Sequence, residues 1–90
     1  MSNPDKWYVY MLRCNDNSYY TGICKDPERR LQQHNKGSGG AKYTRSRRPV
    51  ELVYQEQQDD HSSALKREYK IKQLSSQAKR ALAKDWQITE

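Results

Sequence analysis

The chain has 90 residues and 10.7 kDa, enough for a single domain over residues 1–90, with a thin core because a domain of this size buries only about 60–65% of its unfolded surface. Lys and Arg outnumber Asp and Glu by 17 to 11, and the net charge of +6 favours a polyanionic partner, most often nucleic acid. The sequence shows neither a long apolar run nor a hydrophobic signal region, so we expect a cytoplasmic protein that does not bind membranes.

Two segments rich in aromatic and β-branched residues begin the chain, 7–14 (WYVYMLRC) and 18–24 (SYYTGIC). They flank the turn-forming sequence Asn15-Asp16-Asn17, and together they predict a β-hairpin. For its tyrosines the ordinary role is packing, which we expect to account fully for Tyr19 and partly for Tyr8. The cysteines at the ends of these segments belong to no Cys-x-x-Cys motif, so we predict reduced thiols without zinc.

The length of the hairpin loop decides which tyrosines share a face of the sheet. A three-residue loop with one Asn at positive φ would set Tyr10 opposite Gly22 and Leu12 opposite Tyr20. Tyr10 and Tyr20 would then be diagonal neighbours on one face, about 7–8 Å apart at Cα. A loop of two or four residues would place them on opposite faces. In the three-residue register, we expect Gly22 to leave open space beside Tyr10.

A helix, a basic loop and a third strand follow the hairpin. Asp26-Pro27-Glu28 supplies an N-cap, a first-turn Pro and an acidic residue, so we predict a helix that continues to a stop at Gly37. Residues 37–49 (GSGGAKYTRSRRP) predict an exposed basic loop with at most one helical turn. Residues 50–57 (VELVYQEQ) predict a third strand, with apolar residues in alternation at Val50, Leu52 and Tyr54.

Two further helices complete the predicted fold. Asp59-Asp60 caps a helix over 61–74, and Ser75 or Ser76 caps a shorter one over 77–86. The order ββα, loop, βαα predicts an α/β (α+β) domain with a small, mostly antiparallel three-stranded sheet flanked by helices.

One acidic residue, Glu68, interrupts an apolar helical face. At about 100° per residue, Ala64, Leu65 and Ile71 fall on one side of the helix with Glu68 among them. A carboxylate that faces a core is costly unless it is paired or holds a metal. The alternative is a side chain that passes the small Ala64 to reach water or Arg67.

Arg30 and His34 are spaced i and i+4 on the first predicted helix, so they project from the same face. Together with Glu68 and the two tyrosines they would form a polar group at one place. The alternative is an ordinary solvated helix surface.

Four short segments, taken in order, resemble the motifs of the GIY-YIG nucleases: YVY at 8–10, YTG at 20–22, RLQQH at 30–34 and ALKREYKIKQL at 64–74. The longer segments YYTGICKDPERRLQQHN and GGAKYTRSRRPVELVY are similar to the small stand-alone bacterial branch of that superfamily. Tyr8 and Thr21 replace the first Gly and second Ile of the name motif. Ile23 stands where the nucleotide-excision nuclease has a Lys, and the resemblance leaves open whether Lys25, two residues on, takes that role.

The resemblance implies a reaction and assigns roles to five residues. Glu68 would hold one divalent ion, Mg²⁺ or Mn²⁺, completed by water and phosphate. Arg30 would bind the scissile phosphate, Tyr10 would act as general base, Tyr20 would position water or phosphate, and His34 would accept or relay a proton. Because a phenol with a pKa of about 10 is only about 0.1% ionised at pH 7, Tyr10 would need Arg30, His34 or the metal close by.

The basic loop would contact nucleic acid. Its cations would bind the backbone, and its aromatic residue would stack on an unpaired base. The residues assigned to nucleic-acid binding are Lys25, Lys42, Tyr43, Arg45, Arg47 and Arg48. The alternative for the loop is a flexible solvated segment.

We therefore predict a metal-dependent endonuclease that acts on DNA, structure-specific and linked to DNA repair or processing. Since the nuclease motifs span nearly the whole chain, specificity would come from substrate shape or a protein partner. Two alternatives stay open: a non-catalytic nucleic-acid-binding module that keeps the nuclease fold, and a protein-interaction adaptor. Salt-sensitive nucleic-acid binding would argue against the adaptor.

Overall fold

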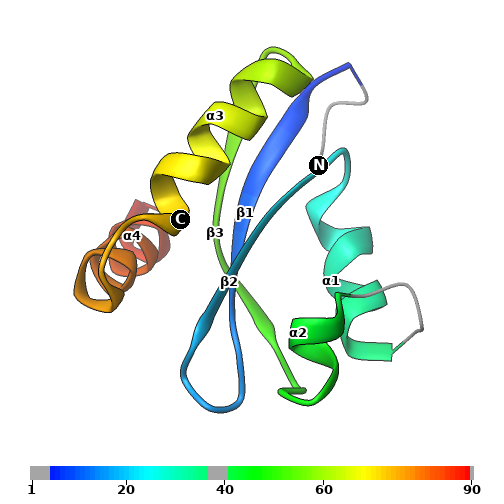
Figure 1. The fold of residues 1–90 in the computed structure, drawn as a ribbon, viewed down its shortest axis with the longest axis vertical. Helices are drawn as coiled ribbons and strands as arrows, with labels where there is room; N and C mark the ends of the chain where they lie inside the picture. Colours follow the sequence, from blue (N-terminus) through cyan, green and yellow to red (C-terminus); the bar gives the residue numbers. More distant parts are fainter. Residues whose placement is uncertain (1–4, 37–40, 90) are drawn as a thin grey trace.

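The computed structural model describes residues 5–36 and 41–89, with side chains described as far as residue 86. A three-stranded sheet has the order β2-β1-β3, with both neighbouring pairs antiparallel, and this confirms the predicted α+β fold (Figure 1). The elements in chain order are β1 (Trp7–Arg13), β2 (Tyr19–Cys24), α1 (Pro27–Lys36), α2 (Lys42–Arg45), β3 (Glu51–Gln58), α3 (His61–Lys72) and α4 (Ser76–Thr89).

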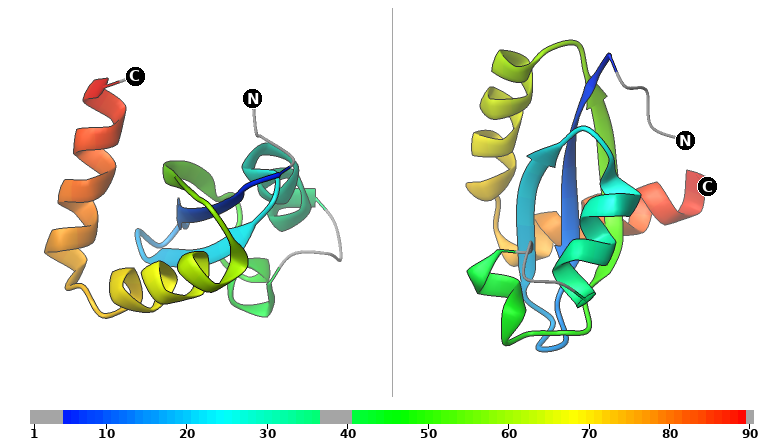
Figure 2. Two further views of the ribbon diagram at one scale, coloured as in Figure 1. Left: turned by 90° about the horizontal axis from the view of Figure 1, so that it is seen from above. Right: turned by 90° about the vertical axis from the view of Figure 1, so that its right-hand side faces the viewer.

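Helices cover both faces of the sheet (Figure 2). Alternate side chains of β1 point to opposite faces, which divides the core into two clusters. The α1-side cluster consists of Tyr8, Tyr10, Leu12, Cys14, Cys24 and Val50. The α3-side cluster, which α4 also covers, consists of Val9, Met11, Val53, Ala64, Ile71 and Ala83, with Tyr19 packed against it. Both cysteines are buried free thiols.

The hairpin has the predicted three-residue loop. Cys14 N donates to Ser18 O at 2.8 Å, and Asn17 adopts the positive φ, 67°. The register sets Tyr10 opposite Gly22 and Leu12 opposite Tyr20, as predicted. The two phenols therefore lie on the same face of the sheet.

Strand β3 departs from the predicted alternation at a β-bulge. Leu52 pairs with Leu12 and Tyr54 pairs with Met11, so Val53 is an extra residue in the ladder. Leu52 packs against the α1-side cluster, whereas Tyr54 packs against the α3-side cluster. The prediction that Tyr54 shares a face with Leu52 is wrong, because the bulge reverses the alternation between them.

The helix starts follow the predicted caps. Asp26 Oδ1 accepts from Arg29 N at 3.2 Å, and Asp60 Oδ1 accepts from Ser63 N at 2.7 Å. Of the two serines before α4, Ser75 is the cap, since its Oγ accepts from Ala78 N at 3.1 Å. Within the described residues, no helix has the length and apolarity needed to cross a membrane.

Candidate active site

The hairpin and α1 bring four of the predicted site residues together on one side of the sheet. The Tyr10 and Tyr20 rings are 6.3 Å apart between centroids, and the His34 ring lies 5.9 Å from Tyr10 and 5.2 Å from Tyr20. Arg30, one helical turn before His34, hydrogen-bonds to Tyr10 and donates to Gln33 Oε1 at 2.9 Å. We call these four side chains, Tyr10, Tyr20, Arg30 and His34, the tyrosine–histidine cluster.

Gly22 does not leave open space beside Tyr10. A Cβ at Gly22 would lie 2.7 Å from Tyr10 Oη and 2.9 Å from Tyr10 Cζ, so the Tyr10 ring itself occupies the position above the glycine. That part of the prediction is wrong, and the reason is that Tyr10 lies flat across the strand beside it. The glycine is required for the packing of the phenol and does not form a floor for substrate.

His34 is buried, which excludes the solvated helix surface as an explanation for it. The side chain has no exposed surface, and its two ring nitrogens have different partners. Nε2 lies 2.9 Å from Tyr10 Oη, and Nδ1 lies 2.8 Å from Thr44 Oγ1. A buried imidazole with partners at both nitrogens is held in one orientation.

Burial sets the charge of the paired side chains. It lowers the pKa of His34 to about 4, assisted by the nearby charges of Arg30 and Arg48, so the imidazole is neutral at pH 7. Burial also raises the pKa of Tyr10 well above the ordinary 10, and this outweighs the lowering by the Arg30 hydrogen bond. The free protein thus holds a neutral phenol against a neutral imidazole, and the neighbours of Tyr10 do not make it acidic on their own.

The low pKa of His34 predicts acid sensitivity. Between pH 6.5 and 4 the unfolded chain binds a proton at His34 that the folded chain does not, so stability falls as pH falls through this window. We expect a loss of about 3 kcal/mol in the free energy of unfolding across it. Urea unfolding at pH 7 and pH 4 measures this loss. His34→Gln should reduce the difference, whereas His61→Gln, at an exposed histidine, should retain it. An equal loss in His34→Gln and the wild type would contradict the assignment.

Glu68 comes from a different part of the fold. It lies on α3, which packs against β1 and β2 through the α3-side cluster. Its side chain is 18% exposed and its Oε2 lies 3.3 Å from Lys72 Nζ. Arg67, the partner considered from the sequence, pairs with Glu56 instead, at 2.9 Å. The structure therefore groups the tyrosines, Arg30 and His34, and sets Glu68 on the helix behind the edge strand β2.

The buried face of α3 is narrower than the apolar face predicted from the sequence. Leu65 is 43% exposed, so its assignment to the core face is wrong. At about 100° per residue Leu65 lies about 100° from Ala64 and about 120° from Ile71, outside the strip formed by those two residues, whereas Glu68 lies only about 40° from Ala64, at the edge of that strip. This position explains why Glu68 is mostly covered yet still reaches Lys72 and solvent.

The residues present fit a single hard cation only in part. Glu68 offers carboxylate oxygens of the kind that Mg²⁺ prefers, and one carboxylate with retained waters suits that ion. Within the described ranges, 5–36 and 41–86, no three His, Cys, Asp or Glu side chains gather into a metal site. An ion held here would take its other ligands from water and from the phosphate of a substrate.

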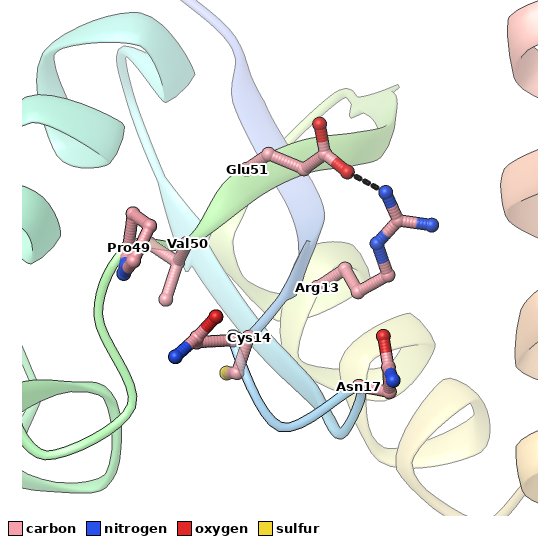
Figure 3. Close-up of a pocket in the computed structure, with 7 residues that line it drawn as sticks. Arg13, Cys14, Asn17, Pro49, Val50 and Glu51 are labelled. Atoms are coloured by element: carbon pink, nitrogen blue, oxygen red, sulfur yellow. Dashed lines mark hydrogen bonds and ion pairs between the residues drawn. The ribbon is translucent and has the colours of Figure 1, made fainter.

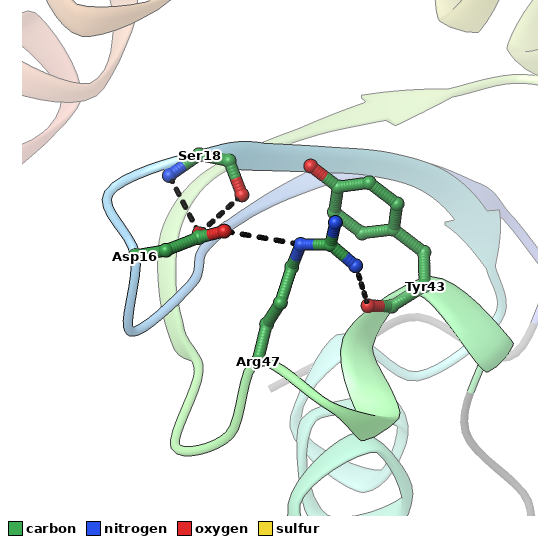
Figure 4. Close-up of polar contacts among 4 residues, drawn as sticks. All are labelled: Asp16, Ser18, Tyr43 and Arg47. Carbon is green, nitrogen blue, oxygen red and sulfur yellow. Dashed lines mark hydrogen bonds and ion pairs between the residues drawn. The ribbon is translucent and has the colours of Figure 1, made fainter.

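The basic loop is tied to the fold from Ala41 onward, while residues 37–40 lie outside the described residues. Thr44 is buried, and the Arg47 side chain contacts two neighbouring residues, Asp16 and Tyr43 (Figure 4). The Arg47 guanidinium donates to Asp16 Oδ2 at 3.1 Å and to Tyr43 O at 2.8 Å, and lies 3.9 Å from the Tyr43 ring centroid. The interpretation as a flexible solvated segment is wrong for this part, because short contacts fix it on both sides.

The predicted nucleic-acid contacts fall into two groups. Lys42 and Arg45 are exposed on α2, and Lys25 is exposed with its Nζ 5.1 Å from the Trp7 ring centroid. Arg47 and Arg48 are half-buried, and Arg48 Nε donates to His34 O. Arg47 and Arg48 therefore hold the loop in place through their hydrogen bonds, in addition to supplying positive charge. Tyr43 stacks on Tyr20, with 6.0 Å between ring centroids.

Sequence reasoning missed the two residues that connect these parts. Thr44 contacts His34, and Asp16 accepts from Ser18 N at 3.1 Å and from Arg47. Asp16 carries a turn signal, because Asp favours this bond to the backbone two residues on. Nothing local marks Thr44, whose role depends on a contact ten residues away.

A separate hollow of about 400 Å³ lies between the hairpin turn and the start of β3 (Figure 3). Its charged lining residues, Arg13 and Glu51, form an ion pair with each other. It adjoins none of the predicted catalytic residues. We therefore place the candidate site at the tyrosine–histidine cluster instead.

The family model of the GIY-YIG catalytic domain matches residues 6–81. The chain belongs to the GIY-YIG family. A UPF0213 protein of Staphylococcus saprophyticus is 59% identical over 75 residues, which cover 83% of this GIY-YIG chain and 90% of that relative. A UPF0213 protein of Desulfotalea psychrophila is 55% identical over 78 residues, covering 87% and 71%. The predicted similarity to small bacterial members of the family is confirmed.

Solved structures agree with the GIY-YIG assignment. The solution NMR structure of a protein from E. faecalis is 41% identical, with a TM-score of 0.65 over 98% of this chain and 93% of that one. The NMR structure of a UPF0213 protein from Bacillus halodurans is 40% identical, with a TM-score of 0.55 over 88% and 83%. This GIY-YIG chain therefore has the fold of an endonuclease family.

Proposed function

We propose that this protein is a metal-dependent endonuclease that hydrolyses phosphodiester bonds in DNA, structure-specific and acting in DNA repair or processing in the cytoplasm. The observation that carries the proposal is the buried contact of 2.9 Å between Tyr10 Oη and His34 Nε2, beside Arg30 and Tyr20. Burying two titratable side chains against each other lowers the stability of a small domain unless their polar atoms are paired. Proton transfer uses such a pair, whereas binding of nucleic acid does not need one.

In this proposal Tyr10 and His34 act together as the base. Tyr10 Oη takes a proton from the attacking water while its own proton passes to His34 Nε2, which becomes an imidazolium. The hydroxide attacks phosphorus, the bond between phosphorus and the leaving oxygen breaks, and that oxygen takes a proton from solvent. A phosphate bound beside His34 would raise its pKa from the resting value of about 4, because an anion favours the charged imidazole. The substrate would thereby make the base effective.

Arg30 and Tyr20 would position the phosphate. A planar guanidinium donates two parallel hydrogen bonds to phosphate oxygens, and Arg30 is half-buried next to Tyr10, where such bonds are strengthened. Tyr20 is the more exposed of the two phenols, so its hydroxyl is placed to hold water or a phosphate oxygen.

Glu68 would hold one Mg²⁺ or Mn²⁺ at the edge of β2. When bound, such an ion stabilises negative charge on phosphoryl oxygens and lowers the pKa of bound water. Glu68 supplies a carboxylate that is already partly desolvated, and its pairing with Lys72 keeps it oriented in the free protein.

The exposed cations on α2 and after β2 would bind the nucleic-acid backbone. Lys42, Arg45 and Lys25 supply sequence-independent affinity, and Arg47 and Arg48 add charge behind them. Phosphate contacts carry no sequence information, so specificity would come from substrate shape or from a protein partner.

Cleavage of labelled DNA tests the proposal. Single-stranded, duplex and branched DNA, with RNA of the same sequences, are incubated with Mg²⁺, with Mn²⁺ or with EDTA. We expect metal-dependent cutting of DNA, and a rate reduced about 10²–10³-fold in Arg30→Ala, because the phosphate loses its clamp. Arg29→Ala removes the same charge from an exposed neighbour and should change the rate by less than about threefold, in line with the small effects of exposed charges.

The second candidate function is a nucleic-acid-binding module that does not cut. The deep burial of Tyr10, 1% exposed with a raised pKa, favours it. Binding that weakens steeply with salt, without cleavage of any substrate, would establish this function in place of the nuclease.

A further inference from the structure

One side of helix α3 exposes an aromatic and an aliphatic side chain to solvent. Tyr69 is 67% exposed, and Leu65, one turn earlier, is 43% exposed. At about 100° per residue the two lie about 40° apart, so they form one apolar strip along the helix. An open hollow of about 480 Å³ lies on this strip, lined by Leu65, Lys66, Tyr69 and Lys70. Neither apolar side chain belongs to a core cluster, so packing within the fold does not explain the strip.

Two lysines border the apolar strip. Lys66 and Lys70 are exposed, and they lie about 60° and about 100° from Tyr69 around the helix. Both also line a second hollow of about 250 Å³. Among the described residues neither lysine forms an ion pair, whereas Arg67, which follows Lys66, is paired with Glu56. The positive charge beside the strip is therefore available to an anionic ligand.

An aromatic ring bordered by cations is typical of surfaces that bind single-stranded nucleic acid. Bases stack on the ring, and the cations follow the phosphate backbone. The faces of a base in a duplex are covered by the neighbouring base pairs, so only an unpaired base can stack on Tyr69. A protein partner fits less well, because protein interfaces bury about 800 Å² on each side and are depleted in Lys.

The strip lies beside Glu68 on the same helix. Leu65 is about 60° from Glu68, and Tyr69 is about 40° further in the same direction, so the order around the helix is Glu68, Leu65, Tyr69 and then the two lysines. Nucleic acid that reaches Glu68 would thus meet Tyr69 within the width of one helix, about 10 Å. The contacts assigned from the sequence lie on other elements, on and after α2 and after β2.

We propose that Tyr69, Lys66 and Lys70 form a binding surface for an unpaired segment of nucleic acid. One base stacks on the Tyr69 ring beside Leu65, and the two lysines hold the phosphates that flank it. The inference deepens the proposed nuclease function and rests on it for the nucleic-acid ligand. It assigns the substrate class, which is DNA with a single-stranded region, such as branched or frayed DNA, rather than a fully paired duplex. The surface reads no sequence, since every base has an aromatic face.

Binding of labelled DNA to the full chain tests the aromatic contact. Fluorescence anisotropy is measured in EDTA, which prevents metal-dependent cleavage, with single-stranded DNA and with a blunt duplex of the same sequence. Tyr69→Ala should weaken single-strand binding about tenfold, as expected for the loss of one stacked base, and should leave duplex binding unchanged. Tyr69→Phe keeps the ring and should bind like the wild type. Because Tyr69 is exposed, urea unfolding should show the same stability in all three proteins.

The salt dependence of binding tests the two lysines. The double variant Lys66→Ala with Lys70→Ala should reduce the slope of log binding constant against log salt concentration by about 1.4 for single-stranded DNA, since each phosphate contact contributes about 0.7. The matched control is Arg80→Ala with Lys84→Ala, an exposed pair with the same i, i+4 spacing on α4, which should leave the slope unchanged. An equal reduction in both double variants would indicate an effect of net charge alone and would overturn the proposal.

The outcomes separate this inference from the proposed function. Single-strand binding that is absent, or that is the same in Tyr69→Ala and the wild type, overturns the inference even if the wild type cuts DNA. An equal loss on the duplex overturns it too, because no unpaired base is then needed. Tyr69-dependent single-strand binding by a protein that cuts nothing supports the surface and rejects the nuclease. Labelled poly-L-glutamate is the probe for an acidic protein partner: if Tyr69→Ala weakens its binding and not that of DNA, the proposal fails.

Discussion

Glu68→Gln is expected to reduce metal-dependent cleavage by about 10³-fold while nucleic-acid binding persists. Glutamine has almost the same shape as glutamate but lacks the negative charge that would hold a divalent ion. Folding should be little affected, because the pair that is lost, with the exposed Lys72, contributes at most about 1 kcal/mol. Cleavage rates over a range of Mg²⁺ concentrations, together with fluorescence anisotropy of labelled DNA, measure both effects.

The matched control is Glu28→Gln, which removes an exposed carboxylate from the first turn of α1. Its cleavage rate should match that of the wild type. The comparison also tests whether α3 contributes to the active site, since Glu68 lies on α3 and the tyrosine–histidine cluster lies on the other face of the sheet. Wild-type cleavage by Glu68→Gln would show that α3 contributes no metal ligand and that the site is confined to the hairpin and α1.

Gly22→Ala is expected to lower the free energy of unfolding by about 1–3 kcal/mol, as overpacking of a filled core does. It is also expected to reduce cleavage strongly. The added methyl would lie 2.7 Å from Tyr10 Oη, closer than non-bonded atoms can approach. Tyr10 is fully packed, so its ring must tilt, and a tilt lengthens the 2.9 Å contact with His34. Urea unfolding and the cleavage assay measure the two losses.

A double-mutant cycle with Tyr10→Phe isolates the cause. Removing Oη removes the closest contact, although Cζ would remain 2.9 Å from the new methyl. Gly22→Ala should therefore destabilise the Tyr10→Phe protein less than it destabilises the wild type. An equal cost in both backgrounds would show that the damage lies in the backbone of β2 rather than in the position of the phenol.

The local parts of the candidate site were predictable because short-range chemistry determines them. The loop Asn15-Asp16-Asn17 sets the register of the hairpin, and a period of two residues then places Tyr10 and Tyr20 on one face. Arg30 and His34 share a helix face through their i, i+4 spacing, and the caps at Asp26 and Asp60 start α1 and α3. In each case the decisive contacts span only a few residues.

The incorrect predictions arise where contacts between distant parts of the chain decide the structure. The bulge at Val53 depends on how β3 meets β1, about forty residues away in the chain, so the alternation in the sequence could not reveal it. The helical rotation of about 100° per residue assigned Leu65 to the core face with Ala64 and Ile71, but the strip buried by packing on the sheet is narrower and leaves Leu65 43% exposed.

The sequence by itself determined the order of the elements, the hairpin register and the identity of the polar side chains, because turn chemistry, helix caps and hydrophobic periodicity act locally. Only the tertiary structure decided the protonation and the hydrogen-bond partners of those side chains. Burial against the sheet makes His34 neutral and keeps Tyr10 protonated, and the fold places Thr44 Oγ1 2.8 Å from His34 Nδ1. Desolvation and hydrogen-bond direction depend on every neighbour in space, and those neighbours come together only when the chain folds.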